Sequence, residues 1–160
     1  MNSSNFNLHE LEFQRIQTIL TKMQRELRAE LVLLINRSGQ PIVTSGSAEN
    51  FDCTALSSLA AANLAATDGL ANIVGEHEFS VLVHQGRNRS LFISDLLKRF
   101  SLVLVFDATT SSGLIRYKCK HTALLLEDVI RDFQRRIEKA ELATTPPQFS
   151  DEELEQLLGG

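Results

Sequence analysis

Few residues in this sequence have the types and spacing that catalysis requires. The candidates are four histidines and two cysteines, namely His9, His77, His84, His121, Cys53 and Cys119. Cys119 and His121 lie two positions apart in a predicted helix, where such residues do not share a face, so the pair supports neither catalysis nor zinc binding. The patterns GxxxxGK, GxSxG and HExxH are all absent from the sequence. We therefore expect no catalytic residue, no metal and no cofactor.

Arginines in loops are the remaining candidates for a catalytic role, because an arginine supplied to a partner's active site can stabilise the transition state of phosphoryl transfer. Four arginines fall in or beside predicted loops, namely Arg37, Arg87, Arg89 and Arg116. A solvated loop or rim position accounts for each of them. No sequence pattern marks any of the four as an arginine finger.

The composition predicts one compact domain and disfavours several functions. The 160 residues are 43% hydrophobic, with a net charge of −4 and a pI near 5.6. An acidic chain without a basic patch does not favour nucleic-acid binding. The sequence has no secretory signal pattern and no apolar run that would span a bilayer, so we expect a cytoplasmic protein without a transmembrane segment. In a reducing cytoplasm Cys53 and Cys119 stay thiols and serve in packing.

The stretch 52–75, DCTALSSLAAANLAATDGLANIVG, is predicted to be the long helix around which the rest of the chain is arranged. Asp52 is a suitable N-cap, Gly75 is a suitable C-terminal stop, and Asp68 is the only charged residue between them. At about 100° per residue, one side of this helix collects larger residues and is expected to face a core. That side comprises Leu56, Leu59, Asn63, Thr67, Leu70 and Val74.

The opposite side of the same helix is small and neutral, which lets another backbone approach closely. Its residues are Ser58, Ala61, Ala62, Ala65, Gly69 and Asn72. A solvated helix face carries Lys and Glu instead, so we interpret this side as a partner-binding surface. The alternative is a helix sandwiched inside its own domain, and periodicity alone leaves both interpretations open.

The rest of the pattern predicts an α+β domain over residues 1–142. Helices are expected at 8–27 and 113–142, and strands at 31–35, 41–46, 79–84, 90–95 and 100–106. The short connections favour one five-stranded, largely antiparallel sheet with helices on its faces, in the order helix-strand-strand-helix-strand-strand-strand-helix. The strand at 31–35 is expected to be buried on both faces. In the last helix the expected apolar side runs through Leu114, Tyr117, His121, Leu124, Leu125, Asp128 and Val129 and continues through Ile130, Phe133 and Ile137.

A linker at 143–149 with two prolines separates this domain from a short helix at 150–160. Ser150 and Glu153 form a capping-box pattern, and Phe149 can pack against Leu154 as a hydrophobic staple. Isolated helices this short are marginal in water. We therefore expect the helix to fold when its apolar residues, Phe149, Leu154, Leu157 and Leu158, enter a groove on a partner. The alternative is that this helix docks on its own domain.

Four stretches carry a resemblance to a known family, from about residue 10 to the C-terminus. They are SGQPIVTSG, DCTALSSLAAANLAATDGLANIVGE, EFSVLVHQGRNRSLFIS and LVLVFDATTSSGLIRYKCK. In these stretches the chain resembles bacterial members of the roadblock/dynein light chain family. The resemblance implies a roadblock/longin-like fold and a homodimer built around a continuous sheet. It also implies that a small Ras-like GTPase binds across the central helices of both protomers, where Ala65 and Gly69 match contact positions.

The resemblance further implies a regulator of that GTPase in cell polarity and gliding motility, located in the cytoplasm at a cell pole. Such proteins accelerate GTP hydrolysis without an arginine finger, by rearranging the GTPase so that its own catalytic residues reach the nucleotide. Their C-terminal helix reaches a second surface of the GTPase and promotes nucleotide exchange. Two other interpretations stay open: a roadblock scaffold or adaptor, and a profilin-like sensor of small molecules. The sensor would need a pocket with convergent polar groups, which the pattern does not show.

Overall fold

The computed structural model describes the backbone of residues 3–79, 81–144 and 150–159, and the side chains within that part from Glu10 to Ala143 and from Ser150. Its helices are α1 (Ser3–Leu27), α2 (Cys53–Val74), α3 (Ser112–Thr144) and α4 (Asp151–Leu158), with a 3-10 turn at Ala48–Asn50. Its strands are β1 (Leu31–Asn36), β2 (Pro41–Gly46), β3 (Val81–Gln85), β4 (Arg89–Leu96) and β5 (Phe100–Asp107). None of the described helices is long and apolar enough to cross a membrane.

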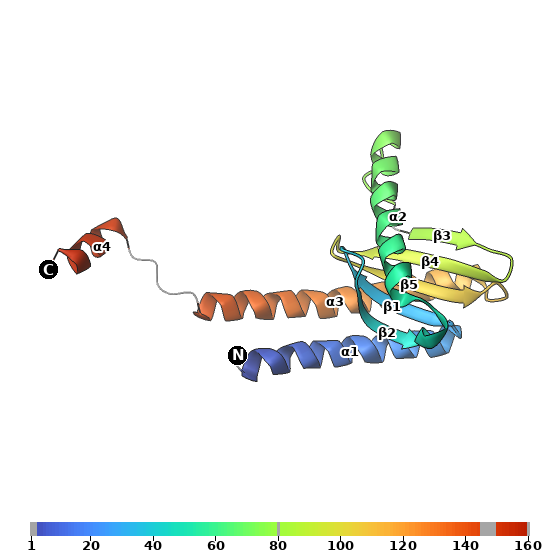
Figure 1. Cartoon of the computed structure of the whole chain (residues 1–160), viewed down its shortest axis with the longest axis horizontal. Coiled ribbons are helices and arrows are strands. Elements are labelled where there is room, and N and C mark those ends of the chain that lie inside the picture. The colour runs from blue at the N-terminus through green and yellow to red at the C-terminus, as the bar shows by residue number, and fades with distance from the viewer. Residues whose placement is uncertain (1–2, 80, 145–149, 160) are drawn as a thin grey trace.

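The five strands form one antiparallel sheet in the order β2-β1-β5-β4-β3. This arrangement confirms the α+β prediction, the element order and the meander of the last three strands. The inner strand β1 is buried from Leu31 to Ile35 on both faces, as its uninterrupted apolar run predicts. Figure 1 shows the reason: α1 and α3 run side by side across one face of the sheet, and α2 crosses the other.

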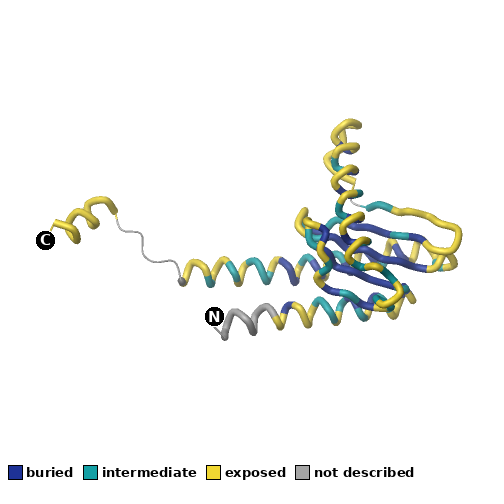
Figure 2. The backbone as a smooth tube through the Cα atoms, in the orientation of Figure 1, coloured by how far each residue is buried: buried dark blue, intermediate teal, exposed yellow. Residues whose placement is uncertain are grey.

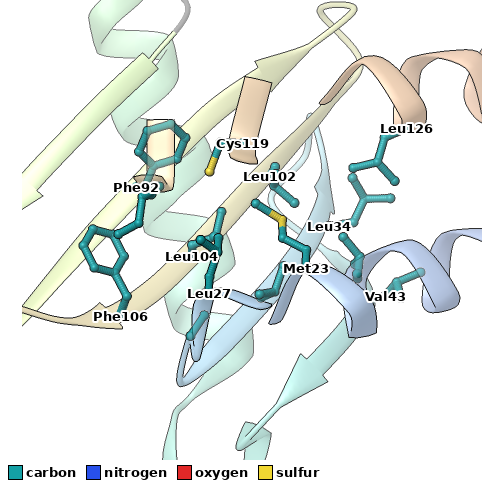
Figure 3. Close-up of a cluster of buried hydrophobic side chains, with 14 of the residues drawn as sticks. Met23, Leu27, Leu34, Val43, Phe92, Leu102, Leu104, Phe106, Cys119 and Leu126 are labelled. Atoms are coloured by element: carbon teal, nitrogen blue, oxygen red, sulfur yellow. The ribbon is translucent and has the colours of Figure 1, made fainter. Parts of the chain in front are cut away.

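The larger core lies between the sheet and the α1/α3 layer. Figure 3 shows its side chains, which come from both helices and from strands β1, β2, β4 and β5. Phe92, Leu102 and Leu104 are fully buried here against Leu20 and Met23 of α1. Because both helices contribute large side chains, this face of the sheet is thoroughly covered.

The smaller core lies between the sheet and α2. It contains Leu31, Leu33, Ile93 and Val103 from the sheet, whereas α2 contributes mainly Ala60 and Leu64. The C-terminal half of α2 continues past the sheet, and Figure 2 shows that half as mostly exposed. One helix with a narrow contact side therefore covers this face incompletely.

The side of α2 that faces the sheet differs from the predicted one. The buried residues are Ser57, Ala60, Leu64, Thr67 and Ala71. Of the predicted core side, Thr67 is buried and Leu56 and Asn63 are half-buried. Leu59, Leu70 and Val74 are instead exposed by 69%, 58% and 66%. The prediction was wrong because it assigned the largest apolar residues to the core.

The β1–β2 turn comes very close to the first half of α2, where small residues make room for it. Gly39, in the β1–β2 turn with φ of 81°, packs against α2 so closely that an added Cβ would lie 2.8 Å from Ser58 Cα. The hydroxyls on the buried side need no outside partner. Ser57 Oγ donates to the carbonyl of Cys53 at 2.6 Å, and Thr67 Oγ1 donates to the carbonyl of Asn63 at 2.8 Å. A backbone-to-backbone fit thus takes the place of bulky packing.

The first half of α3 shows a second correction. Leu114, Tyr117, His121, Leu124 and Leu125 were expected on the buried side, and all five are exposed. The buried residues are Ile115, Cys119, Thr122, Leu126, Val129 and Ile130. Apolar residues occupy more than half of the circumference of this helix, so periodicity did not determine which side meets the sheet. Of the predicted set, only Val129 and Ile130 are fully buried.

Candidate partner-binding surface

The small, neutral side of α2 is divided between an internal contact and open surface. Ser58 Oγ donates to the carbonyl of Gly39 at 3.4 Å, and Ala61 is half-buried near the same turn. The exposed residues Ala62, Ala65, Gly69 and Asn72 lie on the part of the helix that the turn leaves open. A Cβ added at Gly69 would meet nothing within 4 Å. A partner's backbone has room to approach this second group, whose binding role stays a prediction.

A stripe of large apolar residues, which sequence reasoning assigned to the core or passed over, adjoins this small surface. The stripe consists of Leu59, Leu70, Ile73 and Val74, all exposed. The sequence does contain a signal for this stripe: α2 has almost no charge around its whole circumference. That pattern is typical of a helix that is covered on every side. Within a single chain, α2 is covered on one side only. The rest of its apolar surface is therefore available to another protein.

Strand β3 forms the sheet edge next to α2. The Nδ2 of Asn63 and the Nε2 of His84 lie 2.9 Å apart and connect α2 to this strand. Residues Val81–Gln85 contain no Lys, Arg, Asp, Glu or Pro, which usually protect an exposed edge. Gly86 N donates to Arg89 O, which shows that Gly86 directs its backbone groups toward β4. Along an antiparallel strand every second residue does the same, so Val83, three positions earlier, directs its backbone N–H and C=O toward the free edge.

The opposite edge of the sheet, β2, is protected. It begins with Pro41, which lacks a backbone N–H, and the Nε2 of Gln17 in α1 donates to the carbonyl of Thr44 at 3.1 Å. Helix α1 also packs against this strand. Of the two edges, β3 is therefore the one prepared for pairing with another strand.

An ion-pair network borders the exposed side of α2. Asp68, the only charged residue of α2, accepts from Arg37 Nη2 at 2.7 Å and lies 3.5 Å from Lys98 Nζ. Lys98 Nζ also lies 2.9 Å from Glu78 and 3.0 Å from Asp95. The hydrogen bond to Glu78 and the carboxylates of Asp95 and Asp68 raise the pKa of the Lys98 ammonium above its ordinary value.

The same network holds a strained turn. Leu97 and Lys98, which join β4 to β5, have φ angles of 56° and 58°, a left-handed backbone that favours Gly or Asn. Such a conformation persists when the surroundings determine it, and here Lys98 is held by carboxylates from three separate segments. The turn is thereby tied to the C-terminal half of α2.

The described residues contain little chemistry of their own. They include no cluster of three or more His, Cys, Asp or Glu side chains that could hold a metal ion. Burial raises the pKa of the Cys119 thiol to about 12 and also raises that of Cys53, with a smaller contribution from Asp52, so neither is an activated nucleophile. Arg37 and Arg89 are held by carboxylates of this chain, since Arg89 Nε lies 2.6 Å from Glu30 and its guanidinium stacks over Phe51.

Helix α4 begins with the predicted capping box. Ser150 Oγ accepts from Glu153 N at 3.3 Å, and Ser150 N donates to Glu153 Oε2 at 2.8 Å. Leu154, Leu157 and Leu158 are all exposed. Phe149 lies outside the described residues, as does most of the predicted linker, and α3 continues two residues past the predicted domain end, to Thr144. Because these three leucines are exposed, the partner that would cover them stays a prediction.

Comparison with known proteins identifies the class. The Roadblock/LC7 domain family matches residues 15–106, and the chain belongs to this family with a roadblock/longin-like fold. Family and neighbours together indicate a regulator rather than a catalytic enzyme. None of the curated protein sequences matches the chain.

Three solved structures of MglB proteins are similar to this chain over about three quarters of its length. Myxococcus xanthus MglB is 35% identical with a TM-score of 0.73, and the match covers 76% of this chain and 91% of that one. An MglB with a tetrameric arrangement is 30% identical with a TM-score of 0.72, covering 76% and 92%. The gliding protein MglB of Thermus thermophilus is 30% identical with a TM-score of 0.71, again covering 76% and 92%.

Proposed function

We propose that this protein activates GTP hydrolysis by a small bacterial Ras-like GTPase of the MglA type. The observation that carries the proposal is the open side of α2, where Ala62, Ala65 and Gly69 present helix backbone with no charged side chain in the way. The similarity to MglB proteins over 91% to 92% of their chains supports the choice of partner. In this role the protein acts in cell polarity and gliding motility, in the cytoplasm at a cell pole.

The active form is a homodimer whose sheet continues from one protomer to the other through β3. An uncharged edge with outward backbone groups at Val83 supports this pairing. The stripe formed by Leu59, Leu70, Ile73 and Val74 is adjacent and would be covered by the second copy. The small residues of the two α2 helices then form one platform for the GTPase.

Activation proceeds without an arginine from this protein. Arg37 and Arg89 are engaged with carboxylates of their own chain, which supports this part of the proposal. The platform instead rearranges a strand and loops of the GTPase, so that the catalytic residues of the GTPase itself reach the nucleotide. The transition state is stabilised by groups that the partner already has.

Phosphate release from the cognate GTPase, measured with and without this protein, tests the proposal. We expect the protein to raise the hydrolysis rate while having no GTPase activity alone. Arg87→Ala and Arg116→Ala variants serve as controls and should stimulate normally, because no arginine finger is used. Binding without any acceleration would instead identify a scaffold or adaptor.

Helix α4 makes a second contact with the GTPase, through Leu154, Leu157, Leu158 and Phe149, and promotes nucleotide exchange. Its exposed leucines support this role. Deleting residues 148–160 should slow nucleotide release from the GTPase and leave dimerisation intact. Release of a fluorescent nucleotide measures the first effect and light scattering the second, and an unchanged release rate would contradict the role.

A further inference from the structure

An apolar groove lies where α1 and α3 pass beyond the end of the sheet. Its volume is about 280 Å³, and all of its lining residues except Glu12 are apolar. Phe13 of α1 and Ile42 of β2 line it and are exposed by 46% and 37%, and Phe100, Ile130 and Phe133 line it as well. Glu12 is neutralised by Arg15 and Arg136. The groove therefore has an apolar interior and no unpaired charge.

We propose that α4 of the same chain docks into this groove, placing Leu154, Leu157 and Leu158 against Phe13, Ile42 and Phe133. The described arrangement is the open one, in which the three leucines and the exposed groove residues both face solvent. Closing the contact removes both apolar surfaces from water. This docking does not depend on the GTPase proposed above, although a docked α4 would keep its leucines from any other partner.

The length of the tether selects this groove. Phe133 precedes the end of α3 at Thr144 by eleven residues, which is about 16 Å along a helix. The six steps from Thr144 to Ser150 span up to about 20 Å, so α4 can begin beside Phe133. A second groove, on the outer side of α1 and α3, is lined on α3 by Leu125, Asp128 and Val129, which lie about 22–28 Å back from Thr144 along the helix. That distance exceeds the span of about 20 Å that the tether allows.

Charge favours the same site. Helix α4 carries Asp151, Glu152, Glu153 and Glu155 and no basic residue. Lys139 lies about two turns beyond Phe133, where the acidic first turn of α4 would be placed, whereas Arg136 is already paired with Glu12. The pairing is exposed and screened by salt, so it orients α4 while the leucines supply the affinity.

A single tryptophan can report the docking, because the chain contains none. We compare full-length Leu157→Trp with the double variant Leu157→Trp, Ile42→Glu, in which a charge blocks the groove. Relative to the double variant, the single variant should show a blue-shifted emission and an acrylamide quenching constant that is at least twofold lower. Leu157→Trp with Leu124→Glu is the matched control, since Leu124 is exposed on α3 away from the groove, and it should behave like the parent. Equal quenching in all three proteins would overturn the proposal.

A second reporter on the groove side guards against a tryptophan that itself disturbs α4. In Phe13→Trp, deleting residues 148–160 should raise the quenching constant about twofold, with circular dichroism unchanged. If neither reporter is protected, α4 does not dock. Protection that disappears on dilution would place α4 in the groove of a second copy and would also overturn docking within one chain.

Discussion

The two faces of the sheet are covered in opposite ways. On the α1/α3 face, two helices that contact each other bury large side chains such as Phe92 and Met23. On the α2 face, a single helix meets the sheet through small residues and turns Leu59 and Leu70 outward. The outward apolar residues of α3 alternate with Arg116, Lys118 and Lys120, whereas α2 has one charged residue. The first face completes the fold, and the second leaves a surface for association.

Removing a large side chain from each face should separate these roles most clearly. Phe92→Ala empties a fully buried site and should lower the free energy of unfolding by about 3–5 kcal/mol. Leu70→Ala should change it by less than about 0.5 kcal/mol in a monomer, because Leu70 is already exposed. Urea denaturation at two protein concentrations measures both. A larger, concentration-dependent effect of Leu70→Ala would show that a second copy covers α2.

Blocking the open side of α2 should abolish function while sparing the fold. In the double variant Ala65→Arg, Gly69→Arg, two long cations occupy the space that a partner's backbone needs, so stimulation of GTP hydrolysis should fall to the basal rate. The helix should be unharmed, since arginine is a better helix former than glycine. Tyr117→Arg, His121→Arg places the same pair on exposed α3 positions and should stimulate normally. Normal stimulation by the α2 variant, with unchanged circular dichroism in both, would refute the proposed site.

The close approach of the β1–β2 turn to α2 predicts opposite effects at two glycines. Gly39→Ala should destabilise the protein by about 1–3 kcal/mol, because its φ is positive and the new Cβ meets the backbone of Ser58. Gly69→Ala should stabilise it by about 0.5–1 kcal/mol, because that position is helical and open. Chemical denaturation of the two variants measures the difference. Equal stability would mean that α2 does not depend on this close contact.

The ion-pair network beside α2 should contribute the least. Lys98→Met should lower the free energy of unfolding by no more than about 1 kcal/mol, since Lys98 is nearly half exposed, and the loss should shrink at high salt. The pKa of Lys98 is raised by folding. Its contribution is therefore constant below the unfolded pKa of about 10.4 and is lost as pH rises through the higher folded pKa. Thermal denaturation from pH 7 to pH 11 checks this, and a difference that disappears near neutral pH would contradict it.

The sequence alone was sufficient for everything that depends on local preferences. The caps of α2 at Asp52 and Gly75 and the capping box at Ser150 were predicted from residue type, and the structure confirms them. The five strands, the antiparallel hairpin and meander and the burial of β1 also followed from turn residues and apolar runs. Each of these features depends on a few neighbouring residues, which is why no tertiary information was needed.

Only the tertiary structure decided which side of α2 and of α3 is buried. Residue size assigned Leu59 and Leu70 to the core, but Ser57 and Ala60 are buried there instead, and the turn at Gly39 approaches the helix backbone at Ser57 and Ser58. A helix that is apolar on more than one side can be rotated without violating its own periodicity. The rotation of α2 about its own axis depends on how closely its backbone approaches the rest of the domain. The sequence does not give that distance. The same rotation turned leucines outward and so exposed the apolar part of the candidate partner-binding surface.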